Sequence, residues 1–358
     1  MTSSSEWDEE ESPPSLLQGM FSADWLMAQS FPPVEYVVPG LIPEGLSLLV
    51  AAPKIGKSWM ALGLGVAAAS GGFAFDQIEV DQRPVLYLAL EDGRTRLQGR
   101  LRSLDVTEPP SRLHFLTELQ PGRTLATISE FVEAFAADHP LIMLDTLGKS
   151  MPPAMPNETQ YGRDYRVTGA LKNVVDQVPG SSLIAIHHTR KADTADFLEA
   201  VSGTNGIAGA ADTIMVLRRD REESSAILNV TSRDAREGSY GLTLDDCGRW
   251  TLVGSTLAEA AEAAGNSQQT AGLGDRMAEL VAYVNGQRGG VRADEVAAAL
   301  HLSKDDAGRY LRRAFDSGRV ERPKPGLYTP VRSVRSVRFE FDGPDTSDTP
   351  DTPTPAIA

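Results

Sequence analysis

The stretch 46-LSLLVAAPKIGKSWMALGLGVAAAS-70 decides the fold of this chain. Its apolar run LSLLVA predicts a strand that is covered on both faces. The Ala- and Leu-rich residues after Ser58 favour a helix with an apolar side. Between the two, residues 51–58 fit the phosphate-binding loop pattern, with Ala51 in place of the first glycine. Backbone N–H groups of such a loop and of the following helix start attract an anion, so the stretch predicts a nucleoside triphosphate site.

The loop and the first helical turn supply the candidate nucleotide contacts. Lys57 is expected to reach the β and γ phosphates, and the Ser58 hydroxyl to bind Mg²⁺. The simpler alternative is a glycine turn between core elements, and Ala51 adopts fewer backbone conformations than the usual glycine. The full set of candidate contacts is Ala52, Pro53, Lys54, Ile55, Gly56, Lys57, Ser58 and Trp59.

Composition sets the broad class of the protein. A length of 358 residues suits one large or two medium domains, and 41% hydrophobic residues are enough for a sizeable core. The single cysteine, Cys247, forms no intramolecular disulfide and favours a reducing cytoplasm. No apolar run approaches the ~20 residues of a membrane span, and the start MTSSSEWDEEES is unlike a signal peptide. The net charge of -15 argues against nucleic acid when taken alone, but the charge is uneven.

Strands and helices alternate from Tyr36 to about Val253, which is typical of an α/β domain with a mainly parallel sheet. We expect strands at 46–51, 84–91, 113–118, 141–147, 182–188, 212–219 and 225–231, then a hairpin around Cys247-Gly248. Helices are expected at 57–70, 93–104, 127–138, 163–177 and 196–201. The domains that follow from this pattern are a flexible acidic segment 1–35, an α/β domain 36–255, a linker 256–273, a winged helix-turn-helix 274–331 and a disordered tail 332–358.

Carboxylates at two strand ends fit nucleotide hydrolysis, which needs a Mg²⁺ ligand and a group that activates water. Asp145 ends the run LIMLD and fits the metal ligand; the alternative is a capping aspartate after a core strand. Glu91 ends PVLYLALE, which we place next to the phosphate-loop strand, and fits the catalytic base. Asp92 suits the N-cap of the helix that follows.

Two further strand ends carry polar side chains. His187 and His188 point to opposite faces of a strand, which disfavours joint metal binding. One of them fits a sensor of the phosphate state, and a solvated strand end is the alternative. Arg233 and Arg236 follow a late strand and fit arginine fingers that act across a subunit boundary. A solvated basic edge of a hairpin is the alternative for that pair.

The segments AAPKIGKS, LALEDGRTRLQGRL, LIMLDTL, IAIHHTRK and AVSGTNGIAGAADTIMVLRR occur in this order. Over residues 36–253 they resemble the RecA-like ATPases of the RepA type, hexameric replicative helicases of plasmids and phages. The resemblance implies a RecA-like ATPase domain that takes ATP and Mg²⁺. It also implies these roles: Lys57 and Ser58 on nucleotide and metal, Glu91 as base, Asp145 as the Walker B carboxylate, His187 or His188 as sensor, and Arg233 or Arg236 supplied to a neighbour.

DNA is the expected partner of both the ATPase domain and the winged helix. The resemblance places two loops in a ring channel, where basic groups follow a phosphate backbone. Acidic residues in the same loops keep this channel from being strongly basic, and Tyr161 and Tyr165 are the stacking candidates. Residues 274–338 hold 13 Lys/Arg against 8 Asp/Glu, a net +5, which fits major-groove binding by the third helix. The candidate DNA contacts are Lys149, Arg163, Arg190 and Lys191 in the loops and Lys304, Arg309, Arg312 and Arg313 in the helix.

Two functions therefore remain open at this stage. The first is an ATP-driven, RepA-like ring helicase of a phage or mobile element, a hexamer that takes single-stranded DNA in its channel and has the winged helix as a candidate duplex contact. The second is a DNA-binding ATPase that does not translocate and acts as a replication initiator, loader or regulator. A winged helix also serves as a protein docking unit in other proteins, so its partner stays open too.

Overall fold

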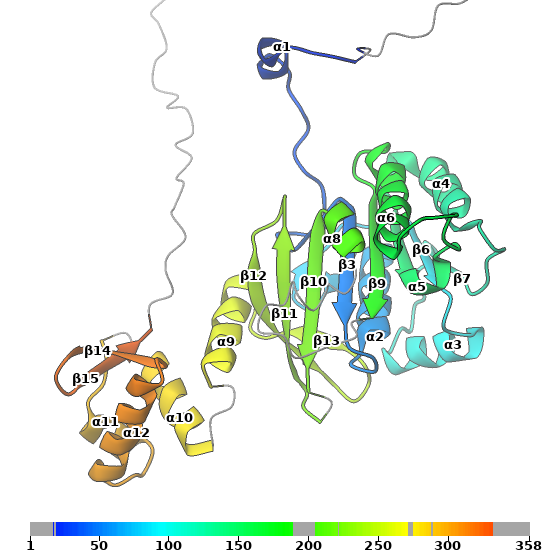
Figure 1. The fold of residues 1–358 in the computed structure, drawn as a ribbon. Coiled ribbons are helices and arrows are strands. Elements are labelled where there is room, and N and C mark those ends of the chain that lie inside the picture. The colour runs from blue at the N-terminus through cyan, green and yellow to red at the C-terminus, as the bar shows by residue number, and fades with distance from the viewer. Residues whose placement is uncertain are drawn as a thin grey trace, which may run out of the picture.

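A nine-stranded sheet forms the centre of the molecule (Figure 1). The structure is a computed structural model that describes residues 17, 19–188, 205–220, 222–270, 275–287 and 289–331. The strand order is β13-β12-β11-β10-β3-β9-β8-β6-β7. Six strands are parallel, and the last three along the chain add antiparallel at one edge. This confirms the expected α/β fold with a mainly parallel sheet.

The parallel strands read as continuous apolar runs because both faces of the sheet are covered. They are β3 (Gly45–Ala51), β6 (Val85–Ala89), β7 (Leu113–Leu116), β8 (Leu141–Asp145), β9 (Ser182–His188) and β10 (Thr213–Arg219). The antiparallel strands are β11 (Ser225–Ser232), β12 (Gly238–Leu244) and β13 (Trp250–Leu252). The β12–β13 pair forms the hairpin expected around Cys247-Gly248, with Leu244 opposite Trp250.

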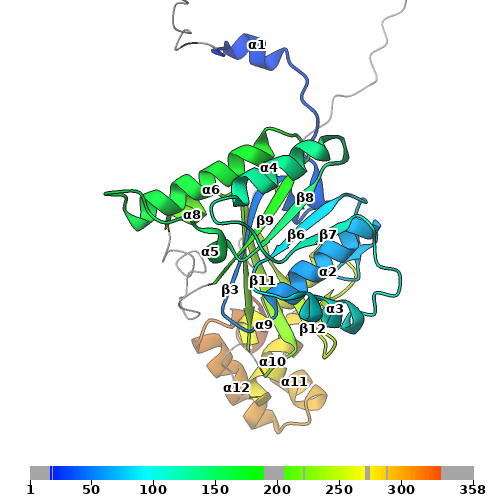
Figure 2. The same cartoon turned by 90° about the vertical axis from the view of Figure 1, so that its right-hand side faces the viewer.

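Alternating side chains of β3 enter two separate cores. Leu49 and Ala51 pack on one face of the sheet, and Leu48 and Val50 pack on the other. The first face is covered by α2 (Lys57–Ser70), α3 (Arg94–Ser103) and α9 (Leu257–Thr270). The second is covered by α4 (Thr124–Ala134), α5 (Leu147–Ser150), α6 (Gln160–Asp176) and α8 (Asn205–Ala210), as Figure 2 shows from the side.

The strand order corrects one expectation. β6 was placed beside the phosphate-loop strand, but β9 and β8 lie between β6 and β3. Apolar strands predict a sheet without saying which strands are neighbours, since the order depends on tertiary pairing. The central place of β3 between β9 and β10 brings its carboxyl end to the crevice where open α/β sheets bind ligands.

Short elements outside the sheet were not expected from the sequence. They are the pair β1 (Tyr36–Val38) and β2 (Ile42–Pro43), the pair β4 (Phe73–Ala74) and β5 (Ile78–Glu79), the turn η1 (Ala136–Asp138) and helix α1 (Ala23–Met27). The segment 256–273, whose composition predicts a helix fragment that runs into a linker, is helical as α9 up to Thr270, and Ala260 and Ala264 of that helix are buried. The helix expected at 196–201 and the tail 332–358 lie outside the described residues.

Residues 275–331 form a small unit with its own apolar core (Figure 1). Its elements are α10 (Asp275–Asn285), α11 (Ala293–Ala299), α12 (Lys304–Asp316), β14 (Val320–Lys324) and β15 (Leu327–Pro330). The core includes Leu280, Val296 and Leu311 from the three helices and Tyr328 from the hairpin. Three helices followed by a two-stranded hairpin is the element order that the sequence predicted here.

Candidate functional site

The loop between β3 and α2 has the backbone of an anion-binding turn. Lys54 and Gly56 have φ values of 67° and 104°, in the left-handed region. A side chain at position 56 would collide with Trp250, whose indole N–H donates to the Gly56 carbonyl at 3.0 Å. Ala51 ends β3 and is not among the described residues with positive φ. Glycine is therefore not required at position 51, and the alanine there carries no conformational cost.

Lys57 is buried at the start of α2 beneath this loop. Its ammonium group donates to the main-chain carbonyls of Ala51 and Ala52 at 2.8 and 2.7 Å. Burial lowers the pKa of Lys57 to about 8, although the carboxylates of Asp145 and Glu91 act in the opposite direction. A buried ammonium held only by neutral carbonyls is stabilised by an incoming anion. Lys57 is therefore suited to a phosphate.

Asp145 ends β8 and lies beside Ser58. Its Oδ2 accepts a hydrogen bond from the Tyr87 hydroxyl at 2.8 Å, whereas its buried Oδ1 has no hydrogen-bond partner among the described residues. Burial raises the pKa of Asp145 above its usual range, and the hydroxyls of Ser58 and Tyr87 partly offset this rise. A buried carboxylate oxygen without a donor, next to a serine hydroxyl, fits the oxygen ligands that Mg²⁺ prefers.

Glu91 follows β6 and points toward the same region. Thr146 donates to its Oε1 at 2.9 Å, and the His188 Nε2 atom lies 3.7 Å from its Oε2. The structure therefore joins three strand ends, those of β6, β8 and β9, around one carboxylate. His187 is the neighbour of His188 on β9, and neighbouring side chains on a strand point to opposite faces.

Asp92 corrects the expectation of a helix cap. The N-cap of α3 is Gly93, and no side-chain cap bond is present there. Asp92 is buried and pairs with Arg96 at 2.8 Å and, at a shorter distance, with Arg100. Arg100 also lies over the ring of Trp59, 5.3 Å from its centroid. Asp92 thus pairs with two arginines of the helix it precedes instead of capping it, and one of these arginines, Arg100, contacts α2 through Trp59.

A cavity of about 550 Å³ lies against the loop, Glu91 and His188, and Asp145 is behind its wall rather than among its lining residues; the size is typical of a small-molecule site. The predicted residues that line it are Pro53, Lys54, Gly56, Lys57, Ser58, Trp59, Glu91 and His188, with Asp92, Arg96, Arg100, Arg219 and Leu244 completing the wall. Arg219, at the end of β10, was missed by sequence reasoning; its Nε donates to the Ile55 carbonyl at 3.3 Å. Tyr87 was missed too, although the polar tip of a buried tyrosine normally has a partner.

Arg233 and Arg236 are not part of this cavity. β11 runs antiparallel to β10, so Arg233 lies beside Asp212, at the edge of the sheet where β3 begins. From Asp212 to the level of Ala51 the strand rises about 16 Å, at roughly 3.3 Å per residue. Arg233 is 64% exposed, and its Nη1 lies 3.7 Å from the Asp212 Oδ1. It cannot reach the phosphate loop of its own chain.

The first predicted DNA loop is largely ion-paired within the chain. Arg163 pairs with Asp164 at 3.0 Å, and Arg166 with Glu158 at 2.7 Å. Hydrogen bonds from Arg166 lower the pKa of Glu158 to about 2. Lys149 is exposed on α5. Arg190 and Lys191 of the second loop lie outside the described residues.

The third helix of the small unit turns a basic face to solvent. Ala307, Leu311 and Ala314 are buried, and Lys304, Arg309, Arg312 and Arg313 are exposed. At 100° per residue the last three of these lie opposite the buried stripe, with Lys304 at its flank. Arg309 also pairs with Asp306 at 2.5 Å.

Comparisons with solved structures found remote similarities. Among solved structures, the ATPase domain of G40P is 14% identical, with a TM-score of 0.47, over 59% of this chain and 85% of that chain. A DnaB-like replicative helicase, described with its interactions with primase, is 14% identical with a TM-score of 0.47, over 58% of each chain. The RadB recombinase is 13% identical with a TM-score of 0.42, over 61% of this chain and 92% of that chain. At these scores the likenesses add nothing to the fold already described.

A family model gives the stronger result. The model described as "AAA domain" matches residues 10–194, which is about half of the chain. The match contains the phosphate-binding loop, Glu91, Asp145 and both histidines that end β9. Because the match covers more than half of the 358 residues, this chain belongs to the AAA domain family.

Proposed function

We propose that this protein hydrolyses ATP at the cavity beside β3. One observation carries the proposal: Lys57, Ser58, Glu91 and His188 line a single cavity, with the Asp145 carboxylate beside Ser58, although the five residues come from four separate segments of the chain. A phosphate cradle alone would bind a nucleotide. The Glu91 carboxylate, which lines the same cavity and is separate from Asp145, adds the group that activates water for hydrolysis.

Each side chain has a role that its surroundings support. Lys57 holds the β and γ phosphates, since its buried ammonium group donates to two neutral carbonyls and has no ion pair within 4 Å among the described residues. Glu91 accepts the proton of the attacking water, with Thr146 fixing its orientation and His188 linking it to β9. Ser58 and Asp145 hold Mg²⁺, which when bound neutralises charge on the phosphates. Tyr87 positions Asp145 by holding one of its two oxygens.

The active assembly in this proposal contains several copies of the chain. Arg233, with Arg236 nearby, is offered to the cavity of a neighbouring copy, because it lies too far from its own. A head-to-tail contact of this kind repeats from copy to copy and closes into a ring. We propose a hexamer, with residues 36–255 as a RecA-like ATPase core.

DNA is the proposed partner of the ATPase. The exposed arginines of α12 and a winged-helix arrangement of 274–331 favour duplex binding, and the loops beyond β8 and β9 favour a single strand. Together these features support a RepA-like ring helicase or replication ATPase of a phage or mobile element.

A second candidate is a DNA-binding ATPase that does not translocate, such as an initiator, loader or regulator. It is favoured by the ion pairs of Arg163 and Arg166. Both arginines of the first loop are ion-paired with carboxylates of the same chain, so less of their positive charge is available to bind a phosphate backbone.

Unwinding of a forked duplex separates the two candidates. The helicase should displace a strand in the presence of ATP, and Lys57→Ala should abolish displacement. Hydrolysis without displacement, together with a footprint on one DNA sequence, would favour the second candidate. Deleting 274–358 should weaken duplex binding at least about tenfold, because several phosphate contacts are lost, while DNA-independent hydrolysis is unchanged.

A further inference from the structure

Two successive carbonyl groups of the phosphate-binding loop accept hydrogen bonds from distant strands. Arg219, the last residue of β10, donates from Nε to the Ile55 carbonyl at 3.3 Å. Trp250, the first residue of β13, donates from its indole N–H to the Gly56 carbonyl at 3.0 Å. The donors lie 164 and 194 residues from their acceptors along the chain. Tertiary structure therefore joins the later strands of the sheet to the loop.

A carbonyl that is held in one direction also fixes the N–H group of the next residue. The C=O and N–H groups of a trans peptide unit lie in one plane and point in opposite directions. The bond from Arg219 therefore orients the Gly56 N–H, and the bond from Trp250 orients the Lys57 N–H. Both N–H groups belong to the turn and helix start where an anion binds. The two side chains thus set the direction of groups that a phosphate needs.

Trp250 is a rigid donor that fits closely against the loop. It is only 5% exposed, and a Cβ atom added at Gly56 would lie 2.9 Å from its indole ring. Gly56 has a φ of 104°, in the left-handed region. Its carbonyl also accepts the first helical bond of α2, from the Met60 N–H at 3.0 Å. The indole therefore adds a second, fixed donor to a carbonyl at the point where the loop becomes a helix.

Arg219 reaches the loop from the neighbouring strand. Leu217 of β10 pairs with Ala51, the last residue of β3. Arg219 is two residues further on, which places it about 7 Å beyond that level at 3.3 Å per residue. Its Nη1 atom donates to the Glu223 carbonyl at 2.6 Å, in the turn after β10. The guanidinium group is thereby held between this turn and the loop.

We propose that Arg219 and Trp250 are positioning residues of the phosphate-binding loop. By holding the Ile55 and Gly56 carbonyls, they keep the N–H groups that follow directed at the phosphates of the nucleotide. The inference rests on the proposed function in one respect, the binding of a nucleoside triphosphate at this loop. Arg219 acts in this account through its Nε donor, and not as a charge that binds phosphate directly.

Two substitutions of Arg219 separate the donor from the charge. The Nε2 atom of a glutamine stands as many bonds from the main chain as the arginine Nε, so Arg219→Gln keeps the donor and removes the charge. Arg219→Ala removes both. The alanine variant should bind ATP about threefold to tenfold more weakly, as expected for one lost hydrogen bond, and the glutamine variant should stay within about twofold of the wild type. Titration calorimetry with ATP measures both affinities.

Trp250→Phe removes the other donor and keeps an aromatic ring against the loop. ATP affinity should fall at least about twofold, and less than in Arg219→Ala, because the Met60 N–H still holds the Gly56 carbonyl. The Arg219→Ala/Trp250→Phe protein should bind more weakly than either single variant. In all of them KM should rise with the dissociation constant while kcat changes less, since a group that only positions the loop acts on binding.

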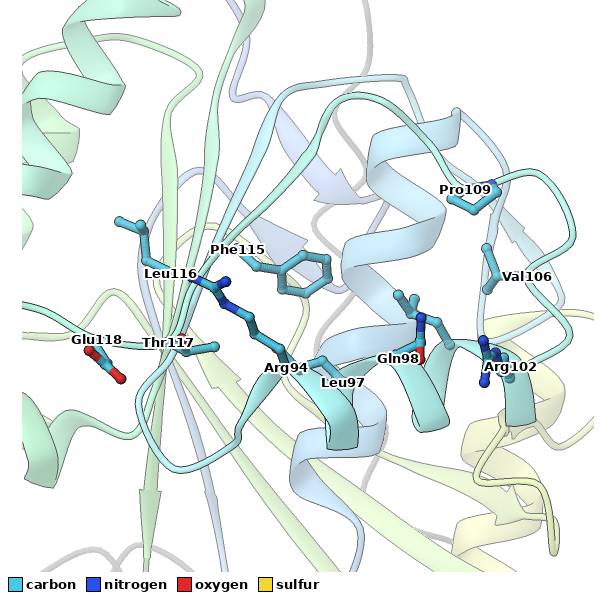
Figure 3. A pocket seen from close by; sticks show the side chains of 11 residues that line it. Arg94, Leu97, Gln98, Arg102, Val106, Pro109, Phe115, Leu116, Thr117 and Glu118 are labelled. Carbon is cyan, nitrogen blue, oxygen red and sulfur yellow. The ribbon is translucent and has the colours of Figure 1, made fainter.

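Arg102→Gln is the matched control for the loss of an arginine charge. Arg102 is exposed on α3 and lines a separate cavity of about 660 Å³ between α3 and β7 (Figure 3). None of the residues that line this cavity lines the nucleotide cavity. The ATP affinity of Arg102→Gln should therefore equal that of the wild type. Urea unfolding gives the folded fraction of each variant, so that affinities are compared per folded chain.

Three results would overturn the positioning role. The first is Arg219→Gln binding as weakly as Arg219→Ala, which would show that the charge itself binds phosphate. The second is wild-type affinity in Arg219→Ala, and the third is wild-type affinity in Trp250→Phe. Turnover is measured separately from binding. Hydrolysis that is unchanged in all variants refutes the positioning alone, and the expected affinities in a chain without turnover refute the proposed hydrolysis alone.

Discussion

The parallel strands of the central sheet begin at one edge and end at the opposite edge, and these two edges differ in how their charged side chains are paired. At the edge where β3 ends, Lys57 bonds only main-chain carbonyls, and the Asp145 Oδ1 has no hydrogen-bond partner among the described residues. At the edge where β3 begins, Asp212 accepts from Lys172 at 2.5 Å and from the Leu46 N–H at 3.0 Å, with Arg233 at 3.7 Å. Asp145, at the first edge, has no ion pair within 4 Å among the described residues, although Asp92 nearby pairs with Arg96 and Arg100; the half-buried Asp212, at the second edge, pairs with Lys172.

The difference shows which edge is built for a ligand. Burial of these charges costs stability, as the lowered pKa of Lys57 and the raised pKa of Asp145 indicate. The cost is offset when a phosphate and a cation bind. Asp212 instead joins α6, β3 and β10 into one structure. Removing a charge should therefore affect activity at the first edge and stability at the second.

Glu91→Gln tests the first edge with the largest expected effect. The amide keeps the size and the Thr146 contact but cannot accept the proton, so turnover should fall about 10³-fold while ATP affinity changes little. Steady-state hydrolysis and equilibrium nucleotide binding measure the two quantities. Turnover within a few-fold of the wild type would remove Glu91 as the base.

Arg233→Ala tests whether the second edge serves a neighbouring copy. The rate of hydrolysis should fall about 10²-fold. This is less than the usual loss when an arginine finger is removed, because Arg236 lies nearby, and the Arg233→Ala/Arg236→Ala protein should lose more activity. Nucleotide affinity should hardly change, since the residue lies far from its own cavity.

Mixing experiments decide between action within a chain and between chains. Lys57→Ala subunits keep a normal Arg233, and Arg233→Ala subunits keep a normal cavity, so a mixture should recover part of the activity. If both variants form assemblies of normal size and the mixture stays inactive, Arg233 has no role across the boundary.

A matched pair of amides compares the two edges directly. Asp212→Asn should lower the free energy of unfolding by about 2 kcal/mol, because a nearly buried carboxylate loses its ion pair with Lys172. Asp145→Asn should leave stability unchanged or slightly higher, because burial already raises the pKa of Asp145 and penalises its charged form. Urea unfolding at pH 7 measures both. Equal destabilisation by the two variants would contradict the contrast between the edges.

The pH dependence of ATP binding gives the smallest effect. The pKa of Lys57 is about 8 in the protein without nucleotide, and adjacent phosphates raise it. ATP binding above pH 8 should therefore take up a proton, and affinity should fall by up to about tenfold per pH unit. Calorimetry in buffers of different ionisation enthalpy measures the uptake. Binding without proton uptake at pH 9 would show that the Lys57 pKa is not lowered; Lys57→Ala controls for other groups.

The sequence predicted the elements of the fold better than their arrangement. The strands ending at Ala51, Asp145 and His188 were predicted because apolar runs of strand length are a local signal. The order of strands was not, and neither was the edge at which Arg233 lies. Both depend on pairing between distant segments of the chain. Because β11 runs antiparallel to β10, the residues that follow β11 lie at the edge of the sheet where β3 begins.

The sequence predicted the site residues that stand at the ends of strands. It missed the residues whose role depends on a tertiary contact. Lys57, Ser58, Glu91 and His188 do line one cavity. Asp92 was expected to cap a helix because it precedes one, but two arginines on that helix pair with it instead. Tyr87 and Arg219 were missed since nothing in a strand sequence says which neighbour a side chain contacts.

The two tryptophans beside the phosphate-binding loop give the protein an intrinsic optical signal. Trp59 lies in the first turn of α2 under Arg100, and the indole of Trp250 is hydrogen-bonded to Gly56. Indole emission responds to nearby charge and to solvent, so nucleotide that enters the cavity should change the fluorescence of both without any added label. Trp250→Phe and Trp59→Phe would assign the signal to one ring. Trp7 and Trp25 are the other two tryptophans of the chain, and the doubly substituted Trp59→Phe/Trp250→Phe protein would measure their contribution.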